Sequence, residues 1–598
     1  MSNILEDVKQ SINWFFTEIG DGLMTIFSYL SQFTETSEIF TLVTRWILPI
    51  LAVMVFFRCI LPLLKDGKRN TVWGYLCMTD GTRFPLNHWE NSIGRSKLSD
   101  VVLNLSFVSR CHAVLTFSDG FWSIADLGSK GGVEVNGEKI EGSQKVKEGD
   151  TLSLAGVKLT LAPADAEAED LPKKDGKPPL FRSAKRIKSA LTLLLILLFQ
   201  ILGGIQICFS MGADVIPAVP LAFLIFIAVE CIYYLIMRRF SKKYFELELL
   251  VYFLCGLDLL VVASSAPSAL YKQLVSILLG IAVFTVLKIL LKDLGRARKL
   301  KYFLAASALV LLALNLAIGE TRFGAKNWIN LGFITIQPLE FVKVAFVIAG
   351  AATLDKLLTS RNLTMFIGFS GACIGVLALM RDFGTAVIFF GAFLVIAFMR
   401  SGDVRTIALI SAGAVLGAIA VVAFMPYVAS RFAAWGHVWE YVYTTGYQQT
   451  RTMIAAASGG LLGVGGGNGY LVNIAAADTD LVFGMLSEEW GLIVALTAVL
   501  IIVFFAVFAV FLSRYCRSSF YAIAACGAAS IFLIQTALNV FGSVDILPLT
   551  GVTLPFVSNG GSSMIASWGL MAFIKSADER LRPNTRPNKE KVAAEKGE

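Results

Sequence analysis

Long apolar runs are the feature of this sequence that most constrains its fold. Ten or more of them reach about 17–25 residues, enough for a helix to cross the ~30 Å hydrocarbon core of a bilayer. Because that core offers no water to backbone N–H and C=O groups, such runs adopt the helix, which satisfies those groups internally. The composition agrees, since 56% of the 598 residues are hydrophobic and only 16% are charged. The sequence therefore predicts a polytopic α-helical membrane protein and excludes a soluble enzyme.

The first apolar run stands apart from the others. It covers about residues 40–64 and is followed at once by Lys65, Lys68 and Arg69. Basic residues that flank a span stay on its cytoplasmic side. We therefore expect residues 40–64 to form a single transmembrane anchor, with residues 1–39 outside as an extracytoplasmic or interfacial segment. The polar segment of residues 1–39 is unlike the short basic amino-terminal region of a secretory signal peptide, so the anchor is expected to stay uncleaved.

About twelve further spans are expected in a second membrane region, residues 187–577. They are centred near residues 200, 227, 256, 283, 311, 349, 373, 393, 416, 500, 531 and 569. When the chain is threaded alternately through the bilayer, every strongly basic loop falls on one side, together with the basic tail, residues 578–598. The positive-inside rule makes that side the cytoplasm. The same rule accounts for the net charge of +8 without a nucleic-acid partner.

Between the anchor and the second membrane region, residues 70–163 follow a different pattern. Short alternating stretches, such as V-V-L-N-L from Val101 and T-L-S-L from Thr151, are separated by Gly, Asp, Asn and Ser. Alternation with a period of two predicts β-strands, so we expect a small all-β domain, placed in the cytoplasm by the charge argument. Residues 164–186 follow as a linker whose composition cannot bury a core.

Three strings in this segment resemble a forkhead-associated (FHA) domain, a β-sandwich that binds phosphothreonine peptides. The strings are S-I-G-R-S-K-L-S-D-V-V-L, V-S-R-C-H-A-V-L and D-L-G-S-K-G-G-V-E-V-N-G. A dianionic phosphate is held by charge-assisted hydrogen bonds, and the resemblance assigns phosphothreonine binding to Arg95, Ser109, Arg110 and Asn136. The chain departs from the family pattern at Gly131, where G-G-V stands instead of Asn-Gly-Thr. A sandwich that serves only as a spacer is the plainer alternative.

Five strings at or near the outer side of the second membrane region carry its Gly, Pro and charged motifs. They are G-A-K-N-W-I-N-L-G-F-I-T-I-Q-P-L-E-F-V-K, R-D-F-G-T-A, G-Y-Q-Q-T-R-T-M-I-A-A-A-S-G-G-L-L-G-V-G-G-G-N-G, D-T-D-L-V-F-G-M-L-S-E-E-W-G and G-V-T-L-P-F-V-S-N-G-G-S-S. Ionisable groups at membrane depth are costly and usually face a polar cavity, so these strings predict a functional site. The plainer alternative is that their charges cap helix ends or form structural bridges. The glycine run lacks a G-K-[ST] ending, which argues against a nucleotide-binding P-loop.

In this order, the five strings resemble the FtsW/RodA family of bacterial shape, elongation, division and sporulation (SEDS) proteins, over about residues 191–576. The resemblance implies a SEDS-type helix bundle in the bacterial plasma membrane that polymerises lipid II into peptidoglycan glycan strands. The implied reaction is an inverting glycosyl transfer that expels undecaprenyl diphosphate. The family has about two spans fewer than we count, so two additional spans are expected before residue 324.

Such a transfer needs a carboxylate base near the acceptor hydroxyl, and cations or a metal ion at the diphosphate. The family's catalytic Asp lies five residues before the G-Y-Q motif, where this chain has Tyr441. The adjacent Glu440 is the candidate base in its place, and His437 is a second candidate. The resemblance implies substrate binding at Glu340, Lys343, Asp382, Asp480, Glu488 and Ser562. Arg451 departs from the family, which has Gln there, and is a further candidate for substrate binding as a phosphate ligand, the alternative being a pair with a neighbouring acid. No cofactor is specified, and the need for a divalent cation is left open.

Three functions remain open from the sequence. The first is an active peptidoglycan glycosyltransferase for cell division or cell shape, which we favour because Glu440 is adjacent to the vacant position. The second is a catalytically degenerate SEDS-like scaffold of wall synthesis, and the third is a lipid-linked precursor transporter. The resemblance implies two partners besides lipid II. These are a class B penicillin-binding protein (a transpeptidase) and a phosphothreonine protein or Ser/Thr kinase at the FHA domain.

Overall fold

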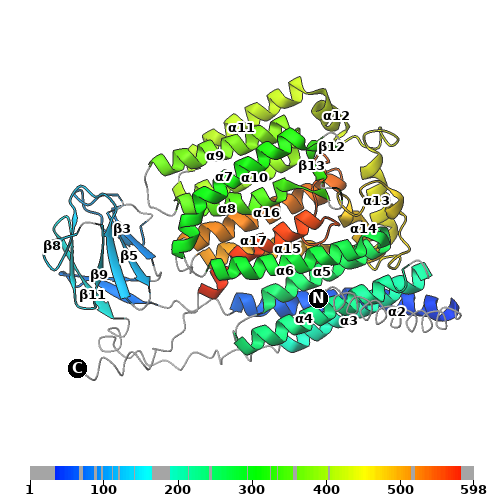
Figure 1. Cartoon of the computed structure of the whole chain (residues 1–598), viewed down its shortest axis with the longest axis horizontal. Coiled ribbons are helices and arrows are strands. Elements are labelled where there is room, and N and C mark those ends of the chain that lie inside the picture. The colour runs from blue at the N-terminus through cyan, green and yellow to red at the C-terminus, as the bar shows by residue number, and fades with distance from the viewer. Residues whose placement is uncertain are drawn as a thin grey trace, which may run out of the picture.

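Figure 1 shows the computed structural model of the chain, a bundle of helices beside a small β-sandwich. The structure describes residues 34–65, 72–86, 90–95, 99–110, 112–118, 121–140, 142–163, 189–212, 215–240, 245–291, 294–322, 325–330, 332, 335–354, 360–401, 404–513 and 519–580. The expected linker and most of the amino-terminal segment and basic tail lie outside the described residues.

The segment expected to be all-β contains eleven strands. They are β1 Gly74–Met78, β2 Arg83–Pro85, β3 Glu90–Gly94, β4 Val101–Val102, β5 Ala113–Ser118, β6 Phe121–Asp126, β7 Val133–Val135, β8 Glu138–Lys139, β9 Ser143–Val146, β10 Thr151–Leu154 and β11 Val157–Pro163. One sheet has the order β2-β1-β11-β10-β7-β8 and the other the order β4-β3-β5-β6-β9. This arrangement confirms the predicted sandwich.

Period-two alternation places the sandwich core between the two sheets. In β11, Val157, Leu159 and Leu161 are buried while Lys158 and Thr160 are exposed. The buried side chains of the sandwich form a hydrophobic cluster separate from that of the helices. The sandwich therefore has its own core, as an independent domain requires.

The rest of the chain is mainly helical. The helices are α2 Thr34–Lys65, α3 Ser189–Met211, α4 Ala218–Phe240, α5 Glu246–Ser265, α6 Leu270–Leu290, α7 Leu294–Ile318, α8 Pro338–Leu354, α9 Ser360–Leu379, α10 Phe383–Ser401, α11 Val404–Phe424, α12 Pro426–Ala434, α13 Tyr447–Gly459, α14 Val482–Glu489, α15 Leu492–Ser513, α16 Ser519–Ser543 and α17 Gly561–Arg580, with short 3-10 turns η4 Pro267–Ala269 and η5 Leu471–Asn473. Each of the twelve expected span centres falls within one of these helices.

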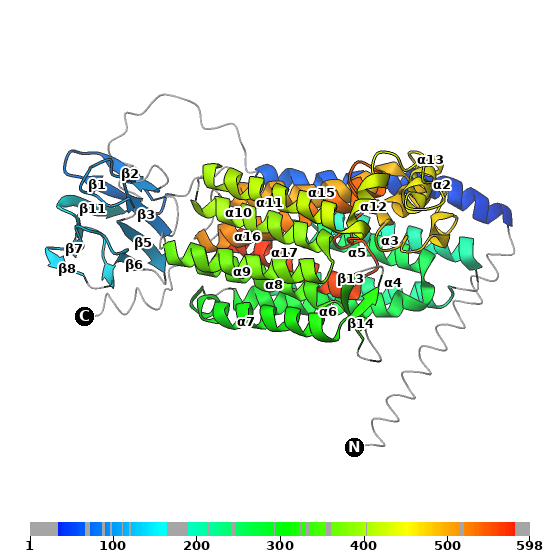
Figure 2. The same cartoon turned by 90° about the horizontal axis from the view of Figure 1, so that it is seen from above.

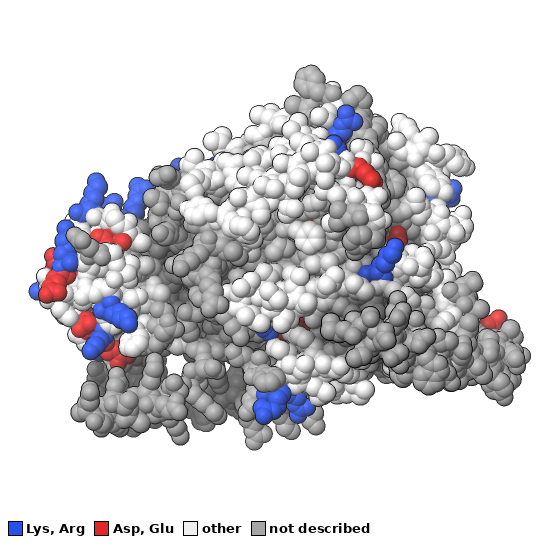
Figure 3. Space-filling view, in the orientation of Figure 1, with Lys and Arg blue, Asp and Glu red and all other residues white. Residues whose placement is uncertain are grey.

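Among the described residues, seven helices are long and apolar enough to cross a membrane. They lie in α2, α3, α4, α5, α6, α15 and α16, and four shorter apolar helices lie within α7, α9, α10 and α11. The face of the bundle in Figure 3 is mostly uncharged, whereas basic and acidic residues gather on the sandwich. These observations fit a multi-pass membrane protein, and the number of spans stays a prediction.

Small residues allow the helices of the bundle to approach closely. A Cβ added to Gly280 of α6 would lie 2.5 Å from the ring of Trp568 in α17, so only glycine leaves room for that ring. Helix α5 is mostly apolar, and its residues from Leu247 to Ser264 are buried on all sides. Figure 2 shows the same bundle from above, with α5 covered by its neighbours.

The expected anchor packs along the bundle. Thr44 of α2 donates a hydrogen bond to Gln206 of α3 at 3.1 Å. Further along the same pair of helices, Arg58 Nε donates to Thr192 Oγ1 at 3.3 Å. Two polar contacts that lie several turns apart along α2 fix it against α3, so α2 is part of the helical domain as well as a tether.

Candidate functional site

The polar strings meet at one end of the bundle, called here the outer end because the sequence predicts it to lie outside the cell. Three short strands precede α8, namely β12 Glu320–Arg322, β13 Ala325–Asn330 and β14 Thr335–Ile336. Proline at the first position then starts α8, because it lacks an N–H that the first turn would leave unpaired. This start carries Glu340 and Lys343 into the bundle.

Lys343 is the best-buried cation of the predicted site, with 2% of its surface exposed. Its Nζ lies 2.7 Å from Glu340 Oε1, one turn earlier on α8. It also donates to Gln535 Oε1 of α16 at 3.0 Å. The Glu340–Lys343 bridge that the i, i+3 spacing allows is therefore formed, and it is buried.

Gln535 extends this network to the last polar string. Its Nε2 donates to the carbonyl oxygen of Thr553 at 2.8 Å and to its Oγ1 at 2.9 Å. Thr553 Oγ1 in turn lies 2.8 Å from Ser563 Oγ at the start of α17. Beside it, Ser562 Oγ accepts a hydrogen bond from Gln337 N at 3.1 Å, which ties the string back to the start of α8.

Asn539 lies one helical turn after Gln535 and binds the string that contains Asp480. Its Nδ2 donates to the carbonyl oxygen of Val552 at 2.7 Å and to that of Asp480 at 3.0 Å. Nearby, Asn559 Nδ2 donates to Asp478 Oδ2 at 2.7 Å. Amides four residues apart on one face of α16 thus hold residues 478–480 and 551–563 against each other.

Asp382 begins α10 as its N-cap. Its Oδ1 accepts a hydrogen bond from Thr385 N at 3.0 Å, as an N-cap carboxylate does. Its Oδ2 accepts from Asn327 Nδ2 of β13 at 3.1 Å. The preceding Arg381 has φ of 60°, which makes the turn into α10 sharp. Both carboxylate oxygens are therefore partnered, so Asp382 positions β13 and α10 at the outer end.

The two adjacent glutamates of α14 hold the glycine-rich run. Glu488 accepts backbone hydrogen bonds from Tyr470 N and Leu471 N, both at 2.9 Å. Glu489 accepts one from Ser264 Oγ of α5 at 2.5 Å. Burial raises the pKa of Glu489 from 4.5 to about 7, and the neighbouring Glu488 adds to the rise. These contacts give both carboxylates a structural role at the outer end.

The glycines of this run are needed because other groups lie against them. A Cβ on Gly466 would lie 2.4 Å from the ring of Trp490, and one on Gly467 would lie 3.0 Å from Met211 of α3. Gly465, with φ of 105°, would place its Cβ 2.7 Å from Gln206. These glycines therefore permit close approach of the run to Trp490 and to α3.

Glu440, Tyr441 and Arg451 lie near the surface of the outer end. Glu440 is exposed and Tyr441 is 41% exposed, in a turn held by Glu440 N on the carbonyl oxygen of His437 at 2.9 Å. Arg451 is half-buried on α13, with its guanidinium 5.3 Å from the centre of the Tyr447 ring. The contacts described above link Glu340, Lys343, Asp480 and Ser562, but none of them reaches Glu440.

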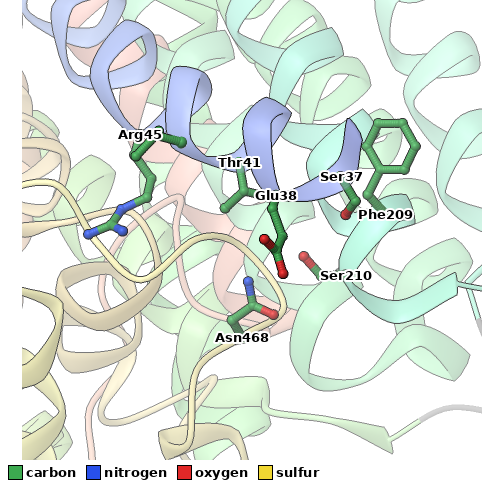
Figure 4. A pocket seen from close by; sticks show the side chains of 8 residues that line it. Ser37, Glu38, Thr41, Arg45, Phe209, Ser210 and Asn468 are labelled. Atoms are coloured by element: carbon green, nitrogen blue, oxygen red, sulfur yellow. The ribbon is translucent and has the colours of Figure 1, made fainter. Parts of the chain in front are cut away.

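A cavity of 380 Å³ lies at the outer end, away from these residues (Figure 4). It is lined by Ser37, Glu38, Thr41, Leu42, Arg45, Phe209, Ser210 and Asn468. These side chains come from α2, from α3 and from the glycine-rich run. None of the predicted substrate-binding residues lines it, so the cavity is distinct from the candidate site.

In the sandwich, the predicted phosphate contacts gather on loops at one end. Ser109 Oγ accepts a hydrogen bond from Lys130 N at 3.1 Å, and Arg95 Nη1 lies 3.5 Å from the carbonyl oxygen of Ser106. Buried His112 accepts a hydrogen bond from Ser109 N at its Nδ1 at 3.2 Å, and its Nε2 lies 2.9 Å from the carbonyl oxygen of Gly132, so it ties the two loops together. Arg95 and Arg110 are exposed, so both guanidinium groups face solvent.

Asn136 differs from the other predicted phosphothreonine ligands. Its Oδ1 accepts a hydrogen bond from Thr151 N at 2.9 Å, and its Nδ2 donates to Asp150 Oδ1 at 2.9 Å. Asp150 also accepts from Lys147 N at 2.7 Å, which is the main cause of its lowered pKa. The amide of Asn136 is therefore engaged in holding the β7–β8 turn.

Sequence comparison decides the family of the helical domain. The model of the FtsW/RodA/SpoVE family, described as cell cycle proteins, matches residues 247–582, more than half of the chain. The chain belongs to this family. The match begins at the start of α5, so α3 and α4 precede it, and the two additional spans before residue 324 stay a prediction.

Curated FtsW and RodA proteins are similar to this chain over most of their length. The probable peptidoglycan glycosyltransferase FtsW of Bacillus subtilis (strain 168) is 27% identical over an alignment of 400 residues, which covers 60% of this chain and 97% of that protein. The probable peptidoglycan glycosyltransferase FtsW of Tolumonas auensis is 35% identical over an alignment of 320 residues, which covers 51% of this chain and 82% of that protein.

Two further matches concern a solved structure and the sandwich. A chain from a peptidoglycan synthase complex that coordinates polymerization and crosslinking has a TM-score of 0.49 and 26% identity, covering 57% of this chain and 100% of that chain. The FHA domain model matches residues 91–155. The FHA resemblance is thereby confirmed, and an FHA domain precedes the FtsW/RodA helices in this chain.

The polar residues that join the FtsW/RodA motifs were missed by sequence reasoning. Gln535, Asn539, Thr553, Asn559 and Ser563 make the contacts between the strings, and none was a candidate. The available signal was the pair of amides four residues apart in the otherwise apolar α16. A buried amide in such a helix needs a partner, which identifies one face of α16 as polar.

Proposed function

We propose that this chain is a peptidoglycan glycosyltransferase that polymerises lipid II into glycan strands for bacterial cell division or cell shape, and that its FHA domain regulates it by binding phosphothreonine. Membership of the FtsW/RodA family and the names of its curated relatives support the activity. The observation that carries the site is the buried Lys343, whose contacts join α8 to Glu340 and to Gln535 of α16.

The proposed reaction joins two lipid-linked disaccharides. A hydroxyl oxygen of the acceptor sugar attacks the anomeric carbon of the donor, and the bond from that carbon to the diphosphate oxygen breaks. Glu440 is proposed as the base that takes the hydroxyl proton, because an exposed carboxylate at the outer end is open to a substrate. Arg451 is proposed to bind the diphosphate leaving group, because its guanidinium is half-buried beside the same turn.

Glu340, Lys343, Asp382, Asp480, Glu488 and Ser562 complete the proposed substrate site. Lys343 adds positive charge near the diphosphate, and its bond to Glu340 is proposed to weaken as the substrate's negative charge arrives. The bonds of Asp382 and Glu488 to backbone N–H groups favour a positioning role for these two residues. Hydrogen-bonded supports of this kind keep reacting groups aligned.

We further propose that the FHA domain and the carboxyl terminus are cytoplasmic, and that the amino terminus and the catalytic loops lie outside the plasma membrane. The distribution of basic residues in the loops supports this orientation. The proposed partners are a class B penicillin-binding protein in the membrane and a phosphothreonine protein or Ser/Thr kinase at the FHA domain. Tethering is the proposed mode of regulation, since a linker separates the two domains.

A scaffold without catalytic activity is the second candidate function. The observation that favours it is Tyr441, which stands where the family's motif has its acid and is 41% exposed. A phenol hydroxyl is a poorer proton acceptor than a carboxylate. In this account the FHA domain and the helical domain recruit other wall enzymes.

Polymerisation of labelled lipid II by the purified full-length protein, alone and with a candidate transpeptidase, separates the two functions. We expect glycan product from the wild type, loss of at least about 100-fold in rate for Glu440→Gln, and retention of activity in His437→Gln. Loss of activity in His437→Gln rather than in Glu440→Gln would identify His437 as the base. No product from folded protein in either setting would favour the scaffold. Glycan product from Tyr441→Asp and none from the wild type would show that the acid at residue 441 is the one catalytic group that the chain lacks.

Phosphothreonine binding is tested separately by a peptide pull-down with full-length protein. Arg95→Ala is expected to remove retention of phosphothreonine peptides, because the guanidinium provides the charge-assisted bonds to the phosphate. Arg83→Ala, which changes an arginine of β2, is the matched control and is expected to retain binding. Equal retention by wild type and Arg95→Ala would contradict the proposal.

A further inference from the structure

The FHA domain of this chain cannot hold the amide that its family pattern expects at residue 131. A Cβ on Gly131 would lie 2.3 Å from Ala155 Cβ and 2.9 Å from Ala155 Cα. Ala155 itself has φ of 51° and is fixed by a hydrogen bond from its N to the carbonyl oxygen of Gly132. A side chain at residue 131 therefore requires movement of the β10–β11 turn, so the position is sterically closed.

Lys139 lies over the neighbouring position. From the place where a Cβ on Gly132 would stand, Lys139 Cε is 3.1 Å away and Nζ is 3.8 Å away. His112 contacts the carbonyl oxygen of Gly132, and it accepts a hydrogen bond from Ser109 N. Lys139 thus extends across the G-G-V string, on the loops that carry the predicted phosphate contacts.

Lys130 adds a second cation beside the same site. Its backbone N–H is bonded to Ser109 Oγ at 3.1 Å, and its side chain is exposed. Lys139 is also exposed. Its cross-strand neighbour is Glu134, yet within the part of the chain that the structure describes no carboxylate lies within ion-pair distance of either lysine. Both ammonium groups are therefore available to an anionic ligand.

We propose that Lys139 and Lys130 take the place of the missing amide and select a phosphothreonine peptide that carries a second anionic group close to the phosphate. The inference rests on the proposed phosphothreonine binding and names its ligand more closely. An amide at residue 131 would recognise peptide backbone whatever its sequence. Two ammonium groups recognise negative charge, so in this chain affinity depends on acidic neighbours of the phosphothreonine.

The test uses full-length protein in detergent and fluorescent synthetic peptides, with binding followed by anisotropy. One peptide has alanines on both sides of the phosphothreonine, a second has glutamates, a third has a second phosphothreonine, and a fourth is the glutamate peptide without phosphate. The variants are Lys139→Gln and Lys130→Gln. Lys158→Gln removes an exposed lysine of β11 and is the matched control, while Arg95→Ala reports phosphate-dependent binding.

We expect the wild type to bind the glutamate and doubly phosphorylated peptides about tenfold more tightly than the alanine peptide. Lys139→Gln is expected to reduce this preference to about twofold, with a smaller effect for Lys130→Gln and none for Lys158→Gln. The preference is expected to weaken as salt is raised, since the lysines are exposed.

Three results would overturn the inference. Equal affinity of the wild type for the alanine and glutamate peptides, with binding still lost in Arg95→Ala, would remove the role of the lysines and leave phosphothreonine binding intact. If Lys158→Gln reduces the preference for acidic peptides as much as Lys139→Gln does, the preference arises from the net charge of the domain and not from Lys139. Absence of binding to all phosphorylated peptides would overturn the proposed phosphothreonine binding and this inference with it.

Discussion

Lys343 is a buried cation with a carboxylate and an amide as its partners, at 2.7 Å and 3.0 Å. Removal of one member of a buried ion pair leaves the other charge without compensation, which costs about 3–5 kcal/mol. We therefore expect Lys343→Met to lower the free energy of unfolding by about 3 kcal/mol, and Glu340→Gln/Lys343→Met to recover most of that loss. Thermal unfolding of the two variants in the same detergent measures the difference. Equal stability of the single and double variants would contradict a buried pair.

Glu489 makes the stability of the outer end depend on pH. Its folded pKa of about 7 lies above the unfolded value of 4.5, so the folded state holds the proton more strongly. Below about pH 4.5 the carboxyl group is neutral, so its burial does not reduce the free energy of unfolding. As pH rises through 7, the free energy of unfolding falls, by roughly 3 kcal/mol once Glu489 is fully ionised. We expect Glu489→Gln to abolish this fall. Hydrogen exchange of the amides of residues 459–473 between pH 5 and 8 measures it.

The Glu489 account fails if wild type and Glu489→Gln show the same pH dependence of exchange in residues 459–473. Glu488→Gln is the matched comparison for Glu489→Gln. It removes the acceptor of two backbone N–H groups, so it is expected to speed exchange of Tyr470 and Leu471 at every pH.

At the scale of elements, the glycine-rich run is defined by its contact with Trp490. Gly466→Ala places a Cβ 2.4 Å from a ring that is 2% exposed, so we expect a loss of about 1–3 kcal/mol in stability. Gly371→Ala in α9 is the matched control, since nothing lies within 4 Å of its Cβ. It is expected to leave stability unchanged or raise it by up to about 1 kcal/mol. Thermal unfolding distinguishes the two, and similar losses would refute the close-packing argument.

Local patterns in the sequence predicted the elements but not the contacts between them. Hydropathy located all twelve helix centres, because it depends on neighbouring residues. The bond between Lys343 and Gln535 joins residues 192 positions apart, which no local period reports. The three-stranded sheet before α8 was missed because its strands are short and β13 and β14 show no alternation of buried and exposed residues.

For the FHA site too, the sequence predicted the positions of residues but not the contacts between them. The G-R and S-x-x-H strings located Arg95, Ser109 and His112 on neighbouring loops, because they are tied to fixed strand ends. The steric closure of Gly131 by Ala155 depends on a turn 24 residues later, so the sequence showed only that the family's Asn is absent. Asn136 was a candidate ligand by position, whereas its hydrogen bonds to Asp150 and Thr151 became visible only in the structure.

For the whole molecule, the proposed orientation predicts which residues face each side of the membrane. Tyr443 is 86% exposed at the outer end, and Lys158 is exposed on the sandwich. In spheroplasts, a membrane-impermeant maleimide is expected to label Tyr443→Cys and to label Lys158→Cys only after lysis. The unsubstituted chain gives the background from native cysteines. Labelling of Lys158→Cys before lysis would reverse the orientation.

The central claim is that the buried network around Lys343 belongs to the site that polymerises lipid II. The most direct measurement is the initial rate of glycan formation from labelled lipid II by wild type, by Glu340→Gln/Lys343→Met and by Lys326→Met. The double variant removes the charges but keeps the fold, and Lys326 of β13 is a control cation whose Nζ donates to the carbonyl oxygen of Leu316 at 2.6 Å. The account predicts loss of at least about 100-fold in the double variant and a change below about threefold in Lys326→Met. Wild-type rates from a folded double variant would contradict it.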